Sequence, residues 1–347
     1  MTSKKIWVTA VVVTYNRKDL LRECLKALLS QTRQPDEILV INNASTDGTE
    51  ELFAAGAEFA RPGISLVTLP ENVGGAGGFC EGIERAMCSK TASESNDCIA
   101  HGSTVKFAST EENESAIVSG TAENKRKAPG ALWIMDDDTI PEEGALAGLL
   151  RAEDDLETEG VMPSFLASAV FGPSGEPMNV PVLDDSKTDN GYADWYRYLS
   201  LGCVAVKQAT FVSLFLPCES VKKAGLPIAG YFIWGDDTEY TRRLVKECGP
   251  AYLCGGSRVL HKRYNIKKIS IWQENDAMRV SMYFYYFRNA LYNAAKYEGR
   301  GKTALRWFGY AAMSFTVFFR RGQKYRGKKF LVIQKGCWAF LFHRMPL

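Results

Sequence analysis

The stretch Ala131-Leu-Trp-Ile-Met-Asp-Asp-Asp-Thr-Ile-Pro141 gives the clearest structural signal in the chain. Its apolar residues predict a buried strand, which ends in three carboxylates, Asp136, Asp137 and Asp138. Because adjacent buried charges are costly without a partner, a cation is expected beside them. Side chains two residues apart on a strand point the same way, so Asp136 and Asp138 can face one ligand, and such paired oxygen ligands suit Mg²⁺ or Mn²⁺. The alternative is a solvated acidic turn that caps a helix beginning near Pro141.

The segments before this stretch alternate between strand and helix patterns. Apolar and β-branched residues predict strands at 6–14, 37–41 and 64–69, and apolar residues at helical spacing predict a helix at 20–29. This alternation favours an α/β fold with a mostly parallel, doubly wound sheet. Ligands bind such sheets beyond the carboxyl ends of the strands. The polar groups at these ends are Thr14-Tyr-Asn-Arg17, Asn42-Asn43, Glu71-Asn72 and the three aspartates.

A glycine-rich stretch, Asn72-Val-Gly-Gly-Ala-Gly-Gly-Phe79, opens the next predicted helix. Glycines let a backbone approach a ligand closely, and a helix N-terminus there would favour a phosphate or a polar sugar. The signal is weak on its own, and a flexible loop explains it equally well. Residues 89–128 are rich in Ser, Thr, Glu, Asn and Ala, which predicts a polar surface insertion with a short hairpin near 99–107 and a solvent-exposed His101.

A second acidic stretch, Tyr231-Phe-Ile-Trp-Gly-Asp-Asp-Thr-Glu-Tyr240, lies in the other half of the chain. It brings Asp236 and Asp237 to the start of a predicted helix, where they either cap that helix or serve a site, and the two roles are compatible. A predicted strand at 251–260 ends at His261. The remaining expected elements are a helix at 141–150, strands at 165–171 and 201–206, and helices from 276 to the C-terminus.

Charge is distributed unevenly along the chain. Residues 258–347 hold 19 Lys and Arg against three acidic residues, whereas the whole chain holds 42 against 40. This basic region suggests a polyanionic partner, and its aromatic residues favour an anionic membrane surface over nucleic acid. Its longest apolar run, 307–319, is too short to span a bilayer but suits the surface of one. The basic residues after this run are Arg320, Arg321, Lys324, Arg326, Lys328 and Lys329.

A solvated helical cap on the rest of the molecule is the alternative for this basic region. The nine cysteines are scattered and form no CxxC pair, which favours reduced thiols in the cytosol over disulfides or a zinc site. The expected location is therefore the cytoplasm, at the inner face of the cell membrane. The sequence leaves the oligomeric state open.

Taken in order, these motifs resemble those of the family 2 glycosyltransferases of the GT-A fold, and most closely the bacterial galactofuranosyltransferase and rhamnosyltransferase branch. The resemblance covers about residues 6–261 and keeps every motif in order, which makes it more specific than any single motif. It implies a GT-A catalytic domain at 1–262, with the polar insertion at 89–128. Residues 263–347 would then form a helical, basic, membrane-associating region.

The resemblance also implies roles for individual residues. In that family the first and third carboxylates of the aspartate motif hold a divalent metal on the donor diphosphate, here Asp136 and Asp138. His261 would complete the metal site, and Asp237 would be the general base. The acceptor sugar would contact Trp234, Asp236 and Glu239. The donor would be bound by Thr14, Tyr15, Arg17, Asn43, Asn72, Gly74, Gly75 and Asp137.

The implied reaction is metal-dependent transfer of a sugar, galactofuranose or rhamnose, from a UDP- or dTDP-sugar to a lipid-linked or polysaccharide acceptor during cell-surface glycan synthesis. The chain departs from many relatives in carrying Asn42-Asn43 where they carry a base-reading Asp. An amide can still pair with uracil or thymine, so the choice between UDP and dTDP stays open. No second carboxylate is placed as a covalent nucleophile, which predicts direct displacement with inversion.

Two other functions remain compatible with the sequence. A sugar-nucleotidyltransferase also uses an α/β sheet and a metal-bound Asp, but usually has a glycine-rich loop after its first strand, where this chain has Tyr15-Asn-Arg-Lys18. A non-catalytic nucleotide- or carbohydrate-binding protein would need neither Asp237 nor a metal. The enzyme requires that acidic side chains from two distant segments meet near one cation.

Overall fold

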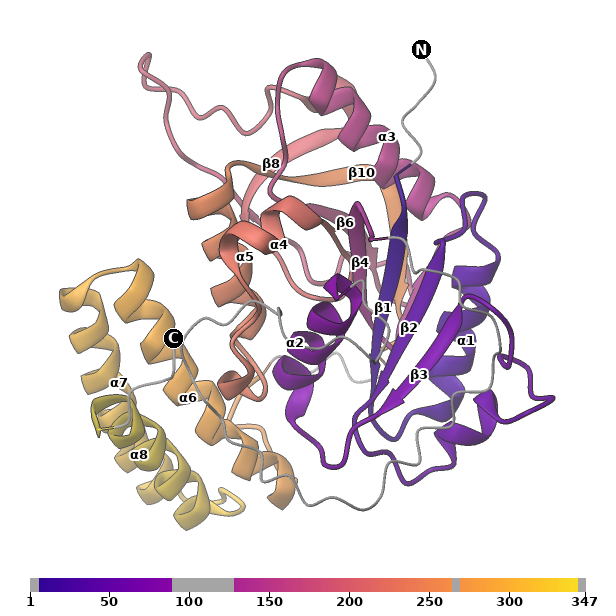
Figure 1. Cartoon of the computed structure of the whole chain (residues 1–347). Coiled ribbons are helices and arrows are strands. Elements are labelled where there is room, and N and C mark those ends of the chain that lie inside the picture. Colours follow the sequence, from indigo (N-terminus) through magenta and orange to yellow (C-terminus); the bar gives the residue numbers. More distant parts are fainter. Residues whose placement is uncertain (1–5, 89–127, 264–268, 343–347) are drawn as a thin grey trace.

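The computed structural model describes residues 6–88, 128–263 and 269–342, and its centre is one ten-stranded mixed sheet (Figure 1). The strands lie in the order β3-β2-β1-β4-β9-β6-β10-β8-β7, with β5 paired to β10. The predicted hairpin near 99–107 and His101 lie outside the described residues. The strands are β1 (Val8–Thr14), β2 (Glu37–Asn42), β3 (Ile64–Thr68), β4 (Ala131–Asp136), β5 (Thr139–Pro141), β6 (Leu166–Phe171), β7 (Val182–Leu183), β8 (Cys203–Gln208), β9 (Leu214–Pro217) and β10 (Ala251–His261).

The first half of the sheet is parallel, as the alternating pattern predicts. Strands β3, β2, β1 and β4 pair in parallel, so β1 and β4 end side by side, with Val13 opposite Asp136. The strand β9 was not predicted; it runs antiparallel between β4 and β6. Antiparallel pairing continues from β10 to β8 and from β8 to β7. The parallel half therefore gathers the polar strand ends at one edge. In the mixed half, β10 pairs in parallel with β6 and antiparallel with β8 and β5, and it ends at His261.

Helices cover both faces of the sheet. One hydrophobic cluster joins α1 and α3 to the face that presents Val12 and Trp133, and the other joins α2, α4 and α5 to the face that presents Val11 and Ile134. Apolar side chains thus alternate between the two faces along β1 and β4, as expected for a sheet buried on both sides. The helices are α1 (Lys18–Leu29), α2 (Gly74–Met87), α3 (Ala145–Thr158), α4 (Cys218–Ala224), α5 (Asp236–Cys248), α6 (Ala277–Tyr297), α7 (Arg300–Phe319) and α8 (Arg326–Phe342).

Strand β10 contains an irregularity that changes which side chains face which layer. Cys254 pairs with Ser168 of β6, but the next pair is Arg258 with Ala169, so the three residues 255–257 have no partner on β6. Cys254 and Val259 consequently belong to the same hydrophobic cluster although their spacing is odd. Beyond the bulge, β10 pairs with β5 and ends with His261 opposite Thr139.

The helices α6, α7 and α8 pack together beside α5, on the side of the molecule away from β2 and β3 (Figure 1). They enclose a third hydrophobic cluster around Tyr283, Phe287 and Ile333. None of the helices in the described ranges combines the length and apolar character needed to cross a bilayer. One of the basic residues expected at the surface is not there: Lys329 is buried and donates a hydrogen bond to the Oε1 of Gln323, 2.9 Å away.

Candidate active site

The three aspartates lie at the end of β4, where the loop after β1 supplies their partners. The Oδ2 of Asp137 accepts a hydrogen bond from the Oγ1 of Thr14 at 2.7 Å. Arg17 contacts two of the three carboxylates. Its Nη1 lies 3.1 Å from the Oδ1 of Asp137 and 2.7 Å from the Oδ2 of Asp138. The backbone N–H of Tyr15 also points at Asp137, 3.4 Å away. Parallel pairing of β1 with β4 thus places a cationic side chain beside the aspartates.

His261 comes to the same place from the far end of β10. Its Nε2 lies 3.1 Å from the Oδ1 of Asp138, and both side chains are buried. Its Nδ1 lies 2.9 Å from the Oδ1 of Asn179, which can only accept, so Nδ1 carries the proton. Its Nε2 therefore faces the Asp138 carboxylate.

The protonation of the three carboxylates reflects an excess of negative charge. Burial, with the charges of Asp138 and Asp137, raises the pKa of Asp136 well above its usual value, and Asp236 adds to this shift. Burial raises the pKa of Asp137 to about 6 although Arg17 opposes it. Burial also disfavours ionised Asp138, but contacts with His261 and Arg17 outweigh that effect and lower its pKa. The single positive charge of Arg17 thus balances only part of the negative charge that the three aspartates carry when they are ionised.

The donor atoms of Asp138 and His261 fit a bound cation. The Oδ1 of Asp138 is buried without a hydrogen-bond partner, and it faces the Nε2 of His261. Asn179 would orient the imidazole, as partners of metal-binding histidines do. Across the described residues, no three His, Cys, Asp or Glu side chains form a ready-made metal group. A cation at this pair would need further ligands, and Mg²⁺ commonly takes them from substrate phosphates and water.

The glycine-rich start of α2 packs mainly against protein. A Cβ on Gly74 would lie 2.1 Å from the backbone oxygen of Phe232, and one on Gly78 would lie 2.6 Å from the side chain of Val13. Gly75 differs, since a Cβ there would meet nothing within 4 Å. Close packing against neighbouring residues thus explains most of these glycines. Of the two glycines expected to bind the donor, Gly74 packs against protein and Gly75 faces open space.

The two asparagines expected near the donor are engaged by the backbone. Asn43 accepts from the N–H of Val73 at 2.9 Å and donates to the carbonyl of Gly74 at 3.0 Å. The Oδ1 of Asn72 accepts a hydrogen bond from the N–H of Gly74 at 2.8 Å. Asn side chains at turns commonly bond the backbone two residues later in this way. These contacts fix the loop that opens α2 and use both polar atoms of the Asn43 amide.

The second acidic stretch forms a tight loop that ends at the start of α5. Gly235 precedes the helix, and Asp236 and Asp237 occupy its first turn, where the helix dipole favours negative charge. Burial, followed by the neighbouring charge of Asp237, raises the pKa of Asp236 to about 8. Burial also raises the pKa of Asp237. Trp234 packs against the aromatic rings of Tyr283 and Tyr286.

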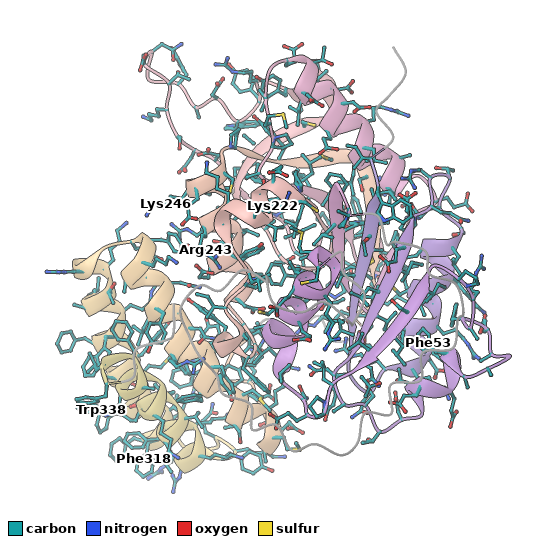
Figure 2. The ribbon with its side chains drawn as sticks, in the orientation of Figure 1. Phe53, Lys222, Arg243, Lys246, Phe318 and Trp338 are labelled. Atoms are coloured by element: carbon teal, nitrogen blue, oxygen red, sulfur yellow. The ribbon has the colours of Figure 1, made fainter. Side chains whose placement is uncertain are left out.

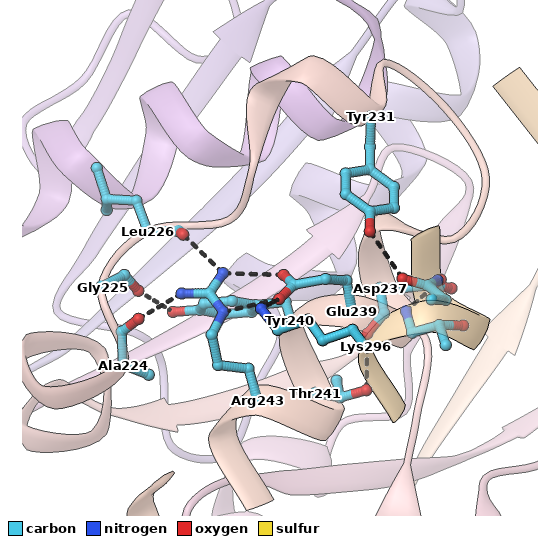
Figure 3. Close-up of polar contacts among 12 residues, drawn as sticks. Ala224, Gly225, Leu226, Tyr231, Asp237, Glu239, Tyr240, Thr241, Arg243 and Lys296 are labelled. Carbon is cyan, nitrogen blue, oxygen red and sulfur yellow. Dashed lines mark hydrogen bonds and ion pairs between the residues drawn. The ribbon is translucent and has the colours of Figure 1, made fainter. Parts of the chain in front are cut away.

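Glu239 lies in the same turn but is completely buried and fully paired (Figure 3). Its two carboxylate oxygens each lie 2.9 Å from the guanidinium of Arg243, one turn later on α5. Lys296 of α6 adds an ion pair of 2.7 Å. These contacts connect α5 to α6 through Glu239, and its expected contact with an acceptor stays a prediction.

Several residues that complete this region have weak sequence signals. The i, i+4 spacing of Glu239 and Arg243 is a recognisable helix pair. Asn179 gives no such signal, because it lies in an irregular loop with φ of 46°. Asn289 and Asn293 of α6 contact the loop before Asp236, and nothing in the sequence around them indicates that role.

Comparisons with known proteins bear on the family and the fold. The family model described as Glycosyl transferase family 2 matches residues 9–88. Galactofuranosyltransferase GlfT1 of Mycobacterium tuberculosis is 38% identical over 260 residues, which cover 73% of this chain and 69% of the relative. Galactofuranosyltransferase GlfT1 of Mycolicibacterium smegmatis is 39% identical over 80 residues, 23% of this chain and only 25% of the relative.

A solved structure shares the fold. The crystal structure of GalNAc-T7 with UDP, GalNAc and Mn²⁺ superposes with a TM-score of 0.50 at 13% identity, and the match covers 84% of this chain and 51% of that chain. At this identity the likeness concerns the fold alone. The predicted α/β architecture of the GT-A type is confirmed.

Proposed function

Because the chain belongs to the family 2 glycosyltransferases, we propose that it transfers galactofuranose from a UDP-sugar to a lipid-linked or polysaccharide acceptor, with inversion at the anomeric carbon and with Mg²⁺ or Mn²⁺ bound. The sugar is proposed from the relatives named galactofuranosyltransferases, one of which matches 73% of this chain. Rhamnose from a dTDP donor is the second candidate, since the amides of Asn42 and Asn43 contact the protein and an amide can pair with either uracil or thymine.

The observation that supports this proposal is that two acidic groups from distant parts of the sequence lie within electrostatic range of each other. Asp138 lies against His261 at the end of β4, and Asp136 lies within electrostatic range of Asp236 at the start of α5. A donor diphosphate beside the first group would place its sugar near the second. The arrangement supports a single site with a donor half and an acceptor half.

The proposed chemistry assigns the proton to Asp237. The acceptor hydroxyl oxygen attacks the anomeric carbon, the bond from that carbon to the diphosphate oxygen breaks, and the hydroxyl proton passes to the Asp237 carboxylate. Arg17, beside Asp137 and Asp138, would offset part of the negative charge on the donor side. When bound, a divalent cation at Asp138 and His261 supplies Lewis-acid stabilisation of the leaving diphosphate.

A donor screen tests the proposed function directly. We expect Mn²⁺-dependent release of UDP from UDP-galactofuranose in the presence of a galactan acceptor, and little release from UDP-galactopyranose or dTDP-rhamnose. Formation of a nucleotide sugar from sugar phosphate and UTP would instead identify a nucleotidyltransferase. Donor binding without transfer or hydrolysis, with any of these sugars, would identify a binding protein.

The raised pKa values of the α5 carboxylates predict an unusual pH dependence. A base acts only when ionised, so a raised pKa moves the acid limb of the kcat profile upward from the range of an ordinary aspartate. Asp236 titrates near 8 beside Asp237, and Glu239 and Asp136 also face this pair. Because Asp236 is mostly protonated below pH 8, Asp236→Asn removes little charge there and should leave the acid limb of Asp237 close to its wild-type position. Measurement of kcat between pH 3.5 and 9 checks both statements: a wild-type limb at pH 4–5 would contradict the first, and a limb that moves by a pH unit or more in the variant would contradict the second.

We further propose that residues 1–262 form the catalytic part and that α7 and α8 bind an anionic membrane. Phe318 and Trp338 lie on the outer side of this helix pair (Figure 2), and Phe319 is 73% exposed. Exposed aromatic and basic side chains together suit the headgroup region of a bilayer. The other exposed members of this surface are Leu305, Phe308, Phe315, Leu331, Leu341, Phe342, Arg320, Arg321, Lys324 and Arg326.

Vesicle co-sedimentation tests this surface. The protein should bind vesicles that contain phosphatidylserine and should bind phosphatidylcholine vesicles weakly, since each basic residue near an anionic surface contributes about 1 kcal/mol. Replacing Phe319 and Trp338 together by Ser should reduce binding at least about tenfold. Tyr192→Ser, at an exposed aromatic residue on the catalytic part, is the matched control. Equal binding of both variants would assign the exposed aromatics to another partner.

A further inference from the structure

The loop that leads to the α5 carboxylates has a strained backbone. Phe232 and Trp234 have φ values of 62° and 63°, and Gly235 has a φ of 92°. Side-chain-bearing residues rarely adopt positive φ, and such strain, which costs about 1–3 kcal/mol per residue, persists only where the surroundings hold it. Phe232 and Trp234 lie within four residues of Asp236, so neighbouring elements must hold this loop in its conformation.

One buried asparagine on α6 supplies most of that support. The Nδ2 of Asn289 lies 2.9 Å from the carbonyl oxygen of Tyr231, 3.0 Å from that of Ile233 and 2.8 Å from that of Trp234. Its Oδ1 is 3.0 Å from the Nε of Arg288, which leaves the amide in one orientation. Three backbone carbonyls of the strained loop therefore converge on the side-chain nitrogen of one fully buried residue.

The same face of α6 continues this contact toward the carboxylates. Asn293 donates to the carbonyl oxygen of Gly235 at 2.8 Å and accepts from the hydroxyl of Tyr231 at 2.7 Å. Further along, Lys296 pairs with Glu239, and the hydroxyl of Tyr297 donates to the carbonyl oxygen of the same residue at 2.9 Å. Positions 289, 293, 296 and 297 lie on one side of a helix.

The opposite side of the loop is held by α2. The N–H of Ala76 donates to the carbonyl oxygen of Phe232 at 3.1 Å, and Gly74 permits the close approach. This contact involves a single carbonyl, whereas α6 contacts four carbonyls of the loop. The support from α6 is therefore the larger.

We infer that Asn289 is a positioning residue of the active site, which holds the loop 231–235 in its strained conformation and thereby fixes the Asp236 and Asp237 carboxylates. The inference rests on the proposed function for its effect on turnover, but the structural effect does not depend on any activity. It also means that α6, although it lies beyond residue 262, completes the catalytic part.

Hydrogen exchange and kinetics on the full chain test the inference together. Asn289→Ala removes the donor, and Asn289→Asp keeps its size but turns an acceptor toward the loop carbonyls. Both variants should speed amide exchange at least about tenfold in residues 231–239. In an active enzyme they should lower kcat at least about tenfold with a donor KM within about threefold, because misplacement of about 1 Å can cost about 100-fold in rate.

Leu291→Ala is the matched control, because Leu291 is equally buried on α6 but belongs to the hydrophobic cluster of the C-terminal helices. It should lower the melting temperature without changing exchange at 231–239 or kcat. Unchanged exchange in both Asn289 variants would overturn the inference whatever the activity. Faster exchange with normal kcat would overturn the positioning role. An inactive wild-type chain would count against the proposed function only, and the exchange data would still decide the structural claim.

Discussion

Asp237→Asn is expected to lower kcat by about 10²–10⁴-fold, the usual contribution of a positioned general base. The amide cannot take the proton of the acceptor hydroxyl, yet it has nearly the same size and can accept the 2.6 Å contact from the N–H of Thr238. The loop and α5 should therefore keep their structure. Steady-state kinetics with a saturating acceptor measure the loss.

Donor affinity separates loss of the base from loss of the site. Since the proposed donor contacts lie at the end of β4, the dissociation constant for UDP with Mn²⁺ should change less than about threefold in Asp237→Asn. Titration calorimetry on both proteins provides that comparison. If the variant retains a tenth or more of the wild-type turnover, another group must accept the proton.

The second large effect is expected at Asp138. Its Oδ1 is the buried oxygen that faces the Nε2 of His261, so Asp138→Asn replaces a charged ligand by a neutral one at the proposed cation site. We expect turnover to fall at least about 100-fold and the affinity for Mn²⁺ to fall at least about tenfold, because a divalent cation offsets the charge of the leaving diphosphate.

The Mn²⁺ affinity should be measured by titration in the presence of UDP, so that the result does not depend on activity. Asp189→Asn, at an exposed aspartate, is the control and should behave as the wild type. Removal of metal by a chelator should abolish wild-type turnover, and Mn²⁺ or Mg²⁺ should restore it. A wild-type enzyme that resists chelation, with unaltered Mn²⁺ binding in Asp138→Asn, would mean that Arg17 alone carries the charge.

The sequence predicts those parts of the fold that have a local pattern. The run of β-branched residues at 8–14 and the apolar run before Asp136 are buried strands, because most of their residues are apolar and helices cover both faces of the sheet. The strand at 214–217 was not predicted, since its four residues are too few for a periodicity to be distinguished. Its antiparallel insertion between β4 and β6 depends on tertiary pairing, which a local pattern does not contain.

In the candidate site, too, the residues with a local sequence pattern could be predicted, and those that depend on tertiary packing could not. Thr14, Arg17 and the aspartates could be grouped from sequence because parallel strands end at a common edge, and the structure shows them in contact. The partners Asn179 and Asn289 could not, since an irregular loop and a helix 110 residues later reach the site only through the packing of the whole chain. The same packing gives Asn43 and Glu239 partners that the sequence does not indicate, the backbone at 73–74 and Arg243, and their expected contacts with substrate stay predictions.

The direction in which the His261 side chain points depends on the number of residues in the β10 bulge. Three unpaired residues between Cys254 and Arg258 reverse the alternation of side chains along the rest of the strand. Deleting one of the two glycines there should restore the even spacing and direct the imidazole to the opposite layer, away from Asp138, although the sequence would still contain both residues. For this enzyme, a change of chain length far from the chemistry should thus be more damaging than most substitutions beside it.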